Sequence, residues 1–155
     1  MSRRAFARPA VVAALLAALL LPVAGPAAQA SEADRVARVA AHQIGDPWRL
    51  GREGPTSFDC SGLVWYAFKQ AGLARRIGGE RRTARGYWAW FAHRGRTSRH
   101  HGHRGDLVIW GGGRHIGIYL GGGRAISTLT SGVGIRGVHQ LTLRFTTFLH
   151  VHVTR

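Results

Sequence analysis

The change of hydrophobic pattern at Gly105-Asp106 constrains the fold more than any other feature of this 155-residue sequence. Before this point, apolar residues recur at the spacing of helix faces, whereas after it short runs rich in β-branched residues alternate with glycines. These runs predict strands at residues 106–110, 115–120, 124–128, 133–138 and 145–153. Helices followed by a meander of antiparallel strands are typical of an α+β fold, with the helices packed on one face of a sheet of about five strands.

Three helices are expected before the strands. The first begins at Ser31 and includes Ile44 on its apolar face. The second begins at Cys60 and ends near Ala71, and residues 83–92 form the third. We expect the aromatic residues of the third helix to lie in the core and in the wall of a cleft, rather than to form a base-stacking surface.

The first thirty residues have the features of an export signal. Three arginines precede eleven uninterrupted apolar residues, and the segment ends in Ala28-Gln29-Ala30, a small-x-small cleavage pattern. The apolar run is shorter than the roughly 20 residues of a permanent membrane helix. We therefore expect residues 1–30 to be a secretory signal peptide and the protein to be secreted. The Arg3-Arg4 pair leaves both the general secretory and the twin-arginine routes open.

Residues 31–155 suffice for a single domain, which we expect to be a monomer. Cys60 is the only cysteine, so an internal disulfide is excluded. The first thirty residues hold three of the 22 basic residues and no acidic one, so the domain has 19 basic and 7 acidic residues, a net charge of +12. Such a charge favours polyanionic partners, but no nucleic-acid-binding motif accompanies it, and we expect no nucleic acid.

Residues 93–104 combine His93, His100, His101 and His103 with several arginines. A zinc site is one interpretation, but the histidines are bunched and no carboxylate or second cysteine lies among them. We therefore expect a solvated, flexible loop without a metal, whose positive charge can hold anionic polymers. No cofactor is called for by any motif in the sequence.

Cys60 is the strongest candidate for chemistry. It follows Asp59, a favourable helix N-cap, and would be the first residue of its helix. The positive end of the helix dipole favours a thiolate there, so we expect a lowered thiol pKa and a nucleophile. A buried, inert cysteine is the alternative. Asp59 and Ser61 flank the nucleophile and can bind substrate, although plain helix capping explains Asp59 equally well.

A catalytic thiol needs an imidazole within hydrogen-bond reach, and His115 is the best placed of the nine histidines. It begins a predicted strand, whose alternation puts His115, Gly117 and Tyr119 on one face. Because Gly117 has no side chain, we expect open space for a substrate beside the imidazole.

These motifs resemble the NlpC-type cysteine peptidases of bacterial cell walls. The resemblance rests on Phe-Asp-Cys-Ser-Gly-Leu-Val-Trp-Tyr-Ala-Phe at 58–68, Gly-Asp-Leu at 105–107 and His-Ile-Gly-Ile-Tyr-Leu-Gly at 115–121, in that order. It implies a papain-like α+β fold, a Cys-His active site and peptidoglycan stem peptides as substrate. The bond usually cut in that family joins D-glutamate to a diamino acid.

The sequence departs from the family pattern at two positions. Trp48 stands where the family usually has a tyrosine; its N–H can donate a hydrogen bond to substrate, but it cannot ionise. The family's third catalytic position, twelve residues after the histidine, is Ser127 here instead of histidine or another strongly polar residue.

The hairpin after His115 decides whether Ser127 can serve as the third residue. If Leu120 and Arg124 close a three-residue loop, Gly117 faces Ser127, and Ser127 lies diagonal to His115 on the same face. A loop of two or four residues would turn Ser127 away, and Thr128 or His139 would then be the candidate.

We therefore expect a secreted cysteine endopeptidase that acts on peptidoglycan through an acyl-enzyme, with Cys60 as nucleophile and His115 as base. Two alternatives stay open. One is a Cys-His amidase that cuts another wall bond, and the other is a non-catalytic wall-binding module on the same scaffold.

Overall fold

The computed structural model describes residues 30–155, and the predicted signal peptide lies outside this part of the chain except for Ala30. It contains helices α1 (Glu32–Ala41), α2 (Cys60–Gln70) and α3 (Ala84–Ala92) and the 3₁₀ helix η1 (Ala74–Ile77). The strands are β1 (Thr97–Ser98), β2 (Leu107–Trp110), β3 (His115–Gly121), β4 (Arg124–Leu129), β5 (Gly132–Gly137) and β6 (Phe145–Leu149). None of the helices described has the length and apolar character needed to cross a membrane.

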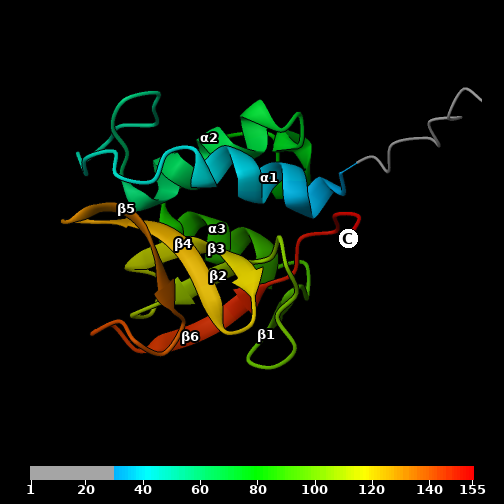
Figure 1. The fold of residues 1–155 in the computed structure, drawn as a ribbon. Coiled ribbons are helices and arrows are strands. Elements are labelled where there is room, and N and C mark those ends of the chain that lie inside the picture. Colours follow the sequence, from blue (N-terminus) through cyan, green and yellow to red (C-terminus); the bar gives the residue numbers. More distant parts are fainter. Residues whose placement is uncertain (1–29) are drawn as a thin grey trace, which may run out of the picture.

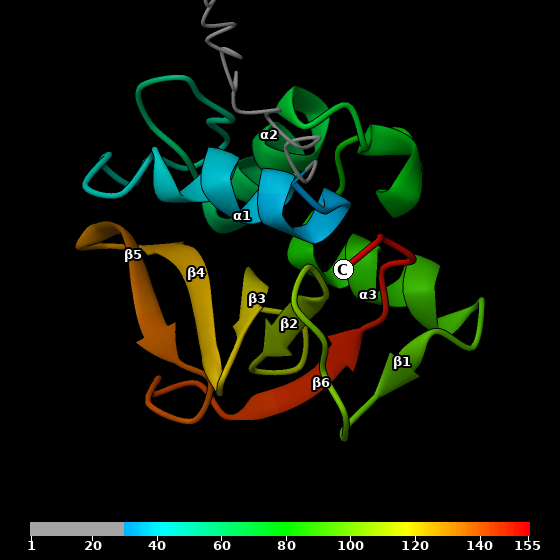
Figure 2. The same ribbon diagram turned by 45° about the vertical axis from the view of Figure 1, so that its right-hand side comes forward.

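All neighbouring strands are antiparallel, in the order β1-β6-β2-β3-β4-β5. Helices α1 and α2 lie over one face of this sheet, and α3 lies at its side toward β6 (Figures 1 and 2). The predicted α+β layout is confirmed, with six strands instead of five.

Each of the three α-helices begins at a side-chain cap. Ser31 accepts a hydrogen bond from the Asp34 N–H, and Thr83 accepts one from the Gly86 N–H. Such caps stabilise a helix by about 1 kcal/mol each, because they satisfy N–H groups that have no partner in the first turn. The predicted start of each helix is therefore confirmed.

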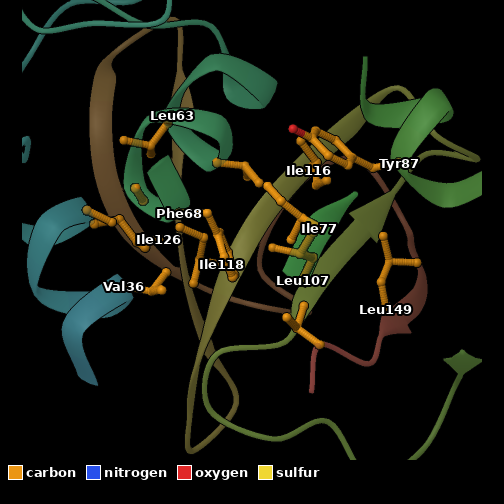
Figure 3. Close-up of a cluster of buried hydrophobic side chains, with 14 of the residues drawn as sticks. Val36, Leu63, Phe68, Ile77, Tyr87, Leu107, Ile116, Ile118, Ile126 and Leu149 are labelled. Carbon is orange, nitrogen blue, oxygen red and sulfur yellow. The ribbon is translucent and has the colours of Figure 1, made fainter. Parts of the chain in front are cut away.

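The main core lies between the helices and the sheet (Figure 3). Phe68 of α2 and Tyr87 of α3 are fully buried in it, together with Ile116 and Ile118 of β3. The opposite face of the sheet has a smaller core that contains Trp110, Tyr119 and Phe148. Alternate residues of β3 thus enter different cores, which makes the register of this strand specific.

Three local predictions were wrong. Helix α1 ends at Ala41 because the next residues form a tighter turn, and Ile44 is 52% exposed instead of lying on the apolar face. The segment 93–104 is not a free loop, because β1 pairs with β6 inside it. Strand β6 ends at Leu149, because the next N–H groups donate to Arg96 and Asp106 and not to a neighbouring strand.

Candidate active site

Cys60 is the first residue of α2, and Asp59 is its N-cap as predicted. The Asp59 Oδ1 accepts hydrogen bonds from the Gly62 N–H at 2.7 Å and the Ser61 hydroxyl at 2.9 Å. The loop before the helix wraps closely around this turn. A Cβ at Gly62 would collide with the carbonyl oxygen of Arg52, so only glycine permits the approach that fixes the position of Cys60.

The second Asp59 oxygen binds groups that the sequence motifs did not reveal. Oδ2 accepts a hydrogen bond from the Gly51 N–H at 2.7 Å and from the Arg81 guanidinium at 2.7 Å. Burial is the largest influence on the Asp59 pKa and raises it, but the bonds from Gly62, Arg81, Ser61 and Gly51 together hold this pKa below its usual value. Asp59 is therefore a charged cap whose four donors come from the protein.

A cavity of about 370 Å³ opens beside this cap. Asp59 and Ser61 line one part of it, and Arg81 lines another, with further contributions from Leu50, Gly51, Arg82 and Thr83. The Arg81 guanidinium in this wall is paired with Asp59 and also lies 3.4 Å from the Glu53 carboxylate, so two carboxylates offset its charge. No short-range signal in the sequence links Arg81 to Asp59, which is 22 residues earlier.

His115 and Ser127 are in direct contact. The Ser127 Oγ lies 2.8 Å from the His115 Nε2 and 2.6 Å from the carbonyl oxygen of Ile116. A carbonyl can only accept, so the single hydroxyl proton of Ser127 goes to Ile116, and Oγ accepts the proton of Nε2. Neutral His115 is thereby held as the Nε2–H tautomer, which leaves the lone pair of Nδ1 free to take a proton.

The loop of the β3-β4 hairpin is shorter than the predicted three residues, although Ser127 still lies on the expected face of the sheet. Gly121 pairs with Arg124, so the loop itself has only two residues, and a bulge at Leu120 compensates for the shorter loop. Ile118 pairs with Ile126, so Gly117 faces Ser127 as the three-residue loop would require.

The two other candidates for the third position have different surroundings. Thr128 is buried, and its hydroxyl has no hydrogen-bond partner among the residues described. His139 is exposed and packs edge-on against Phe145. Of the three, Ser127 makes the hydrogen bond to His115.

The expected open space beside His115 is filled. The Trp110 ring lies 5.5 Å from the imidazole, centroid to centroid, and its N–H donates to the Val138 carbonyl at 2.6 Å. A Cβ at Gly117 would lie 3.0 Å from the Ser127 Cβ and 3.1 Å from Trp110. Gly117 is therefore needed for close packing beneath the imidazole, and Trp110 is a site residue that the sequence motifs missed.

Cys60 begins α2 and His115 begins β3, and these two elements pack against each other. The backbone N–H of Ile116, the residue after His115, makes a hydrogen bond that favours the Cys60 thiolate. Among the residues described, no hydrogen bond joins the thiol itself to the imidazole.

The expected low thiol pKa is not borne out. Burial, the largest influence, raises the pKa of the Cys60 thiol, and the Asp59 charge raises it further, against the smaller effect of backbone N–H groups. Burial also lowers the pKa of His115 to about 4. Near pH 7 the resting pair is therefore a neutral thiol and a neutral imidazole, suited to proton transfer as a substrate arrives.

Trp48 lies on the loop that leads to Asp59. Its backbone forms a β-bridge with Phe58, and the residue is 40% exposed. It is thus open to solvent at the approach to α2.

Comparison with known proteins places this geometry in a family. The sequence model of the NlpC/P60 family matches residues 45–151. The Listeria grayi protein named probable endopeptidase p60 is 36% identical over 99 residues, which are 62% of this chain and 18% of that protein. The Corynebacterium glutamicum protein named probable endopeptidase Cgl2188 is 32% identical over 126 residues, which are 81% of this chain and 55% of that one. The chain thus spans only part of the length of these relatives.

Solved structures show the same fold. The NlpC/p60 domain of the peptidoglycan hydrolase SagA matches with a TM-score of 0.61 and 27% identity, over 77% of this chain and 98% of that one. The peptidoglycan hydrolase RipB from Mycobacterium tuberculosis matches with a TM-score of 0.59 and 30% identity, over 80% and 64% of the two chains. RipD from the same organism, described as a non-catalytic NlpC/p60 domain protein adapted to peptidoglycan binding, matches with a TM-score of 0.63 and 24% identity, over 79% and 99%. With its papain-like α+β fold and its cysteine and histidine at the junction of α2 and β3, the chain belongs to the NlpC/P60 family.

Proposed function

We propose that this protein is a cysteine endopeptidase that hydrolyses an amide bond in the stem peptides of peptidoglycan. The hydrogen bonds that link His115 through Ser127 to Ile116 support this function most, because they leave the imidazole with a free lone pair on a strand that packs against the helix that Cys60 begins. The family match and the names of the relatives agree with the reaction class.

In the proposed mechanism, His115 Nδ1 takes the Cys60 thiol proton as the sulfur attacks the carbonyl carbon of the amide. The C–N bond then breaks, and the imidazolium gives its proton to the leaving amine. A water molecule activated by His115 hydrolyses the resulting thioester and regenerates the thiol. The Cys60 backbone N–H at the start of α2 is the proposed donor to the oxyanion, which the helix dipole also stabilises.

Ser127 is proposed as the group that orients the imidazole. Its hydroxyl fixes the tautomer but has no negative charge, so it stabilises the imidazolium less than a carboxylate would. A triad of Cys60, His115 and Ser127 is consequently expected to be less effective in catalysis than one whose third member is a carboxylate.

The cavity beside the N-cap is the proposed binding region for the stem peptide. Asp59 already has four donors, so its proposed contribution is to hold Arg81 and the nucleophile turn. The guanidinium groups of Arg81 and Arg82 line this region and are proposed to donate hydrogen bonds to a carboxylate of the peptide, such as that of D-glutamate before a diamino acid. Ser61 and the Trp48 N–H are proposed as further contacts to the peptide.

A non-catalytic wall-binding module is the second candidate. The raised thiol pKa, the neutral Ser127 and the fold likeness to RipD favour it. The presence of both Cys60 and His115 favours the enzyme.

Digestion of purified peptidoglycan, followed by mass spectrometry of the fragments, tests the proposal and identifies the bond. We expect new stem-peptide fragments from the wild type and none from Cys60→Ala or His115→Ala. Because the two residues act as one unit, the double variant should be scarcely worse than either single one. Cleavage between muramic acid and L-alanine would assign the amidase alternative. Wall binding without cleavage would assign the binding module.

We also propose that the protein is exported and that anionic wall polymers retain it. The net charge of +12 outside the first thirty residues supports such retention. On the surface, the Arg94 guanidinium stacks 3.9 Å from the Trp90 ring, and Arg82 and Arg96 lie within 6 Å of the same ring. N-terminal sequencing of the protein recovered outside the cell would show whether cleavage follows Ala30.

A further inference from the structure

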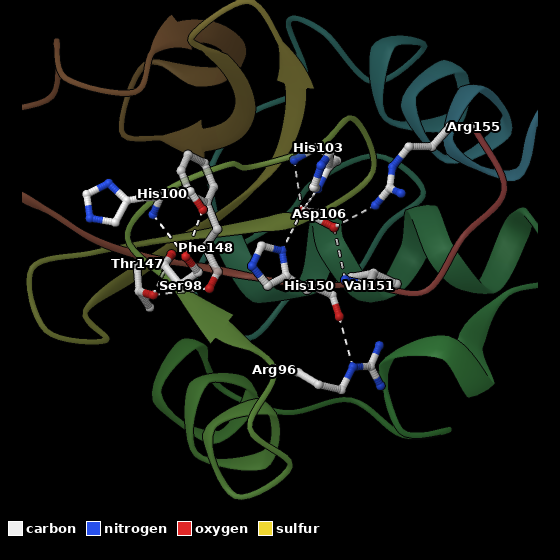
Figure 4. A network of polar contacts seen from close by, with 10 residues as sticks. All are labelled: Arg96, Ser98, His100, His103, Asp106, Thr147, Phe148, His150, Val151 and Arg155. Carbon is white, nitrogen blue, oxygen red and sulfur yellow. Dashed lines mark hydrogen bonds and ion pairs between the residues drawn. The ribbon is translucent and has the colours of Figure 1, made fainter.

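Three potential metal ligands meet at the start of β2, away from the proposed catalytic pair. Asp106 immediately precedes β2, whereas Trp110 at the other end of this strand pairs with His115. The two ends are roughly 13 Å apart, since a strand rises about 3.3 Å per residue. Around Asp106 gather His103, from the loop before β2, and His150, from the tail after β6 (Figure 4).

The Asp106 carboxylate has distinct roles for its two oxygens. Oδ1 accepts a hydrogen bond from the Val151 N–H at 3.0 Å and lies 3.7 Å from the Arg155 guanidinium. Oδ2 accepts one from the His103 N–H at 2.9 Å and lies 2.9 Å from the His150 Nδ1. The side chain is completely buried, so these bonds hold Oδ2 in place facing the two histidine rings.

The His103 ring stands beside this carboxylate without a hydrogen bond to it. Its Nδ1 lies 3.6 Å from Oδ2, too far for a hydrogen bond, and its side chain is half exposed. One ring nitrogen of His103, one of His150 and a carboxylate oxygen of Asp106 all lie within 4.8 Å of one another. The backbone bond from His103 holds this residue beside Oδ2, and the distance from its Nδ1 to Oδ2 leaves room for a cation bound to both atoms.

We propose that His103, Asp106 and His150 form a binding site for a zinc ion, with water as the fourth ligand. Zinc bonds of about 2.0–2.2 Å in a tetrahedron place neighbouring ligand atoms about 3.3 Å apart. The separations of 2.9 and 3.6 Å bracket this value, and the exposed His103 ring is free to adjust. Two imidazoles and one carboxylate suit zinc and related transition metals, whereas calcium and magnesium require more oxygen ligands.

The metal would connect two segments that are distant in sequence. It would tie the tail after β6 to the loop before β2, and the same tail contacts the start of α1 through Thr154. Binding through the His150 Nδ1 requires the proton that this atom now shares with Asp106 to move to Nε2, so zinc would select the other tautomer of His150. The expected role is stabilisation of the fold, independent of peptide hydrolysis.

The test measures the thermal stability of the intact chain with and without zinc, in a Cys60→Ser background. This substitution removes the thiolate that could bind zinc together with His115. At ten times the dissociation constant, zinc should raise the Tm by about 4 °C or more. His103→Ala and His150→Ala should each abolish the shift. His100→Ala and His152→Ala are the matched controls, one from the same loop and one from the same tail, and both should keep it.

Cobalt absorption provides a second readout, because a tetrahedral Co²⁺ site gives intense visible bands. We expect these bands in the Cys60→Ser protein and in both controls, and their loss in His103→Ala. No Tm shift and no bands with the intact site would overturn the proposal, as would a shift that survives both ligand substitutions. If His150→Ala does not fold, His103→Ala decides alone, because its side chain makes no hydrogen bond among the residues described. Neither readout depends on wall hydrolysis, so failure here leaves the proposed function untouched.

Discussion

Replacing Ser127 by alanine tests how the imidazole is held. The substitution removes the acceptor that lies 2.8 Å from His115 Nε2 and the donor that lies 2.6 Å from the Ile116 carbonyl. Both partners sit in a buried site, and a buried polar group that loses its partner costs about 1–3 kcal/mol. We expect a loss of stability in that range.

The catalytic cost should be smaller than that of losing the base itself. Without Ser127, His115 keeps its place beside Trp110 but can adopt the other tautomer, whose Nδ1 carries the proton and cannot accept one. If this costs about 1.4 kcal/mol of transition-state stabilisation, kcat/KM for a soluble stem peptide falls about tenfold. Thr128→Val is the matched control, because it removes a neighbouring buried hydroxyl that has no partner among the described residues.

The assay combines kinetics with the ¹⁵N NMR shifts of the His115 ring. We expect the Nε2–H tautomer in the wild type and in Thr128→Val, and a mixture of tautomers in Ser127→Ala. The reasoning is refuted if Ser127→Ala and Thr128→Val have equal kcat/KM, or if Ser127→Ala is as inactive as Cys60→Ala. If His139→Ala alone abolishes turnover, the third position is wrong while the family assignment stands.

Four further predictions follow from the same geometry. The His115 pKa is about 4 in the folded protein and about 6.5 in the unfolded chain. Between these pH values the unfolded chain binds a proton at His115 that the folded protein does not, so the free energy of unfolding should fall by about 3 kcal/mol as the pH is lowered from 6.5 to 4. His115→Gln should lose this pH dependence. The rate of Cys60 alkylation should rise with pH and reach its midpoint above pH about 8.5. A rate that already reaches its plateau below pH about 7 would contradict the raised thiol pKa. Gly117→Ala should lower kcat/KM, because the added Cβ would lie only 2.7 Å from the Ile126 carbonyl oxygen and would also crowd Ser127 and Trp110. Gly134→Ala, whose Cβ would meet only a flexible arginine, should not lower it. Added salt should weaken retention on intact walls more than cleavage of a small stem peptide, because exposed charges more than ~10 Å apart are screened at about 0.1 M salt; equal effects would place the basic surface within the substrate site.

Local patterns were sufficient to predict the three α-helices and five of the six strands, whereas η1 and β1 were missed. The caps at Ser31, Asp59 and Thr83 marked the helix starts, because capping depends on residues within one turn. The alternation in β3 likewise separated His115 from Ile116.

Features that depend on contacts between distant segments could not be predicted. The glycines at 121–123 allow several turns, and the bulge at Leu120 depends on how the flanking strands pair. The Arg81 bond to Asp59 and the Trp110 packing on His115 exist only once the chain is folded. The thiol pKa was mispredicted because helix position is visible in the sequence whereas burial is not.

The proposed ligand cluster around Asp106 could not be predicted from the sequence for the same reason. His103 lies in the histidine-rich segment, but its expected partners lie just after that segment and 47 residues further along. A search for metal ligands within the segment therefore could not find them.

Acid-quench mass spectrometry of the protein during turnover on a stem peptide tests the central claim most directly. The account predicts a thioester adduct on the Cys60 peptide whose mass equals the acyl half of the cleaved substrate, and which disappears as the substrate is consumed. His115→Ala should not form this adduct, and Ser127→Ala should form it about tenfold more slowly. Cleavage of the substrate by Cys60→Ala, or wall binding by the wild type with neither adduct nor cleavage, would contradict the account.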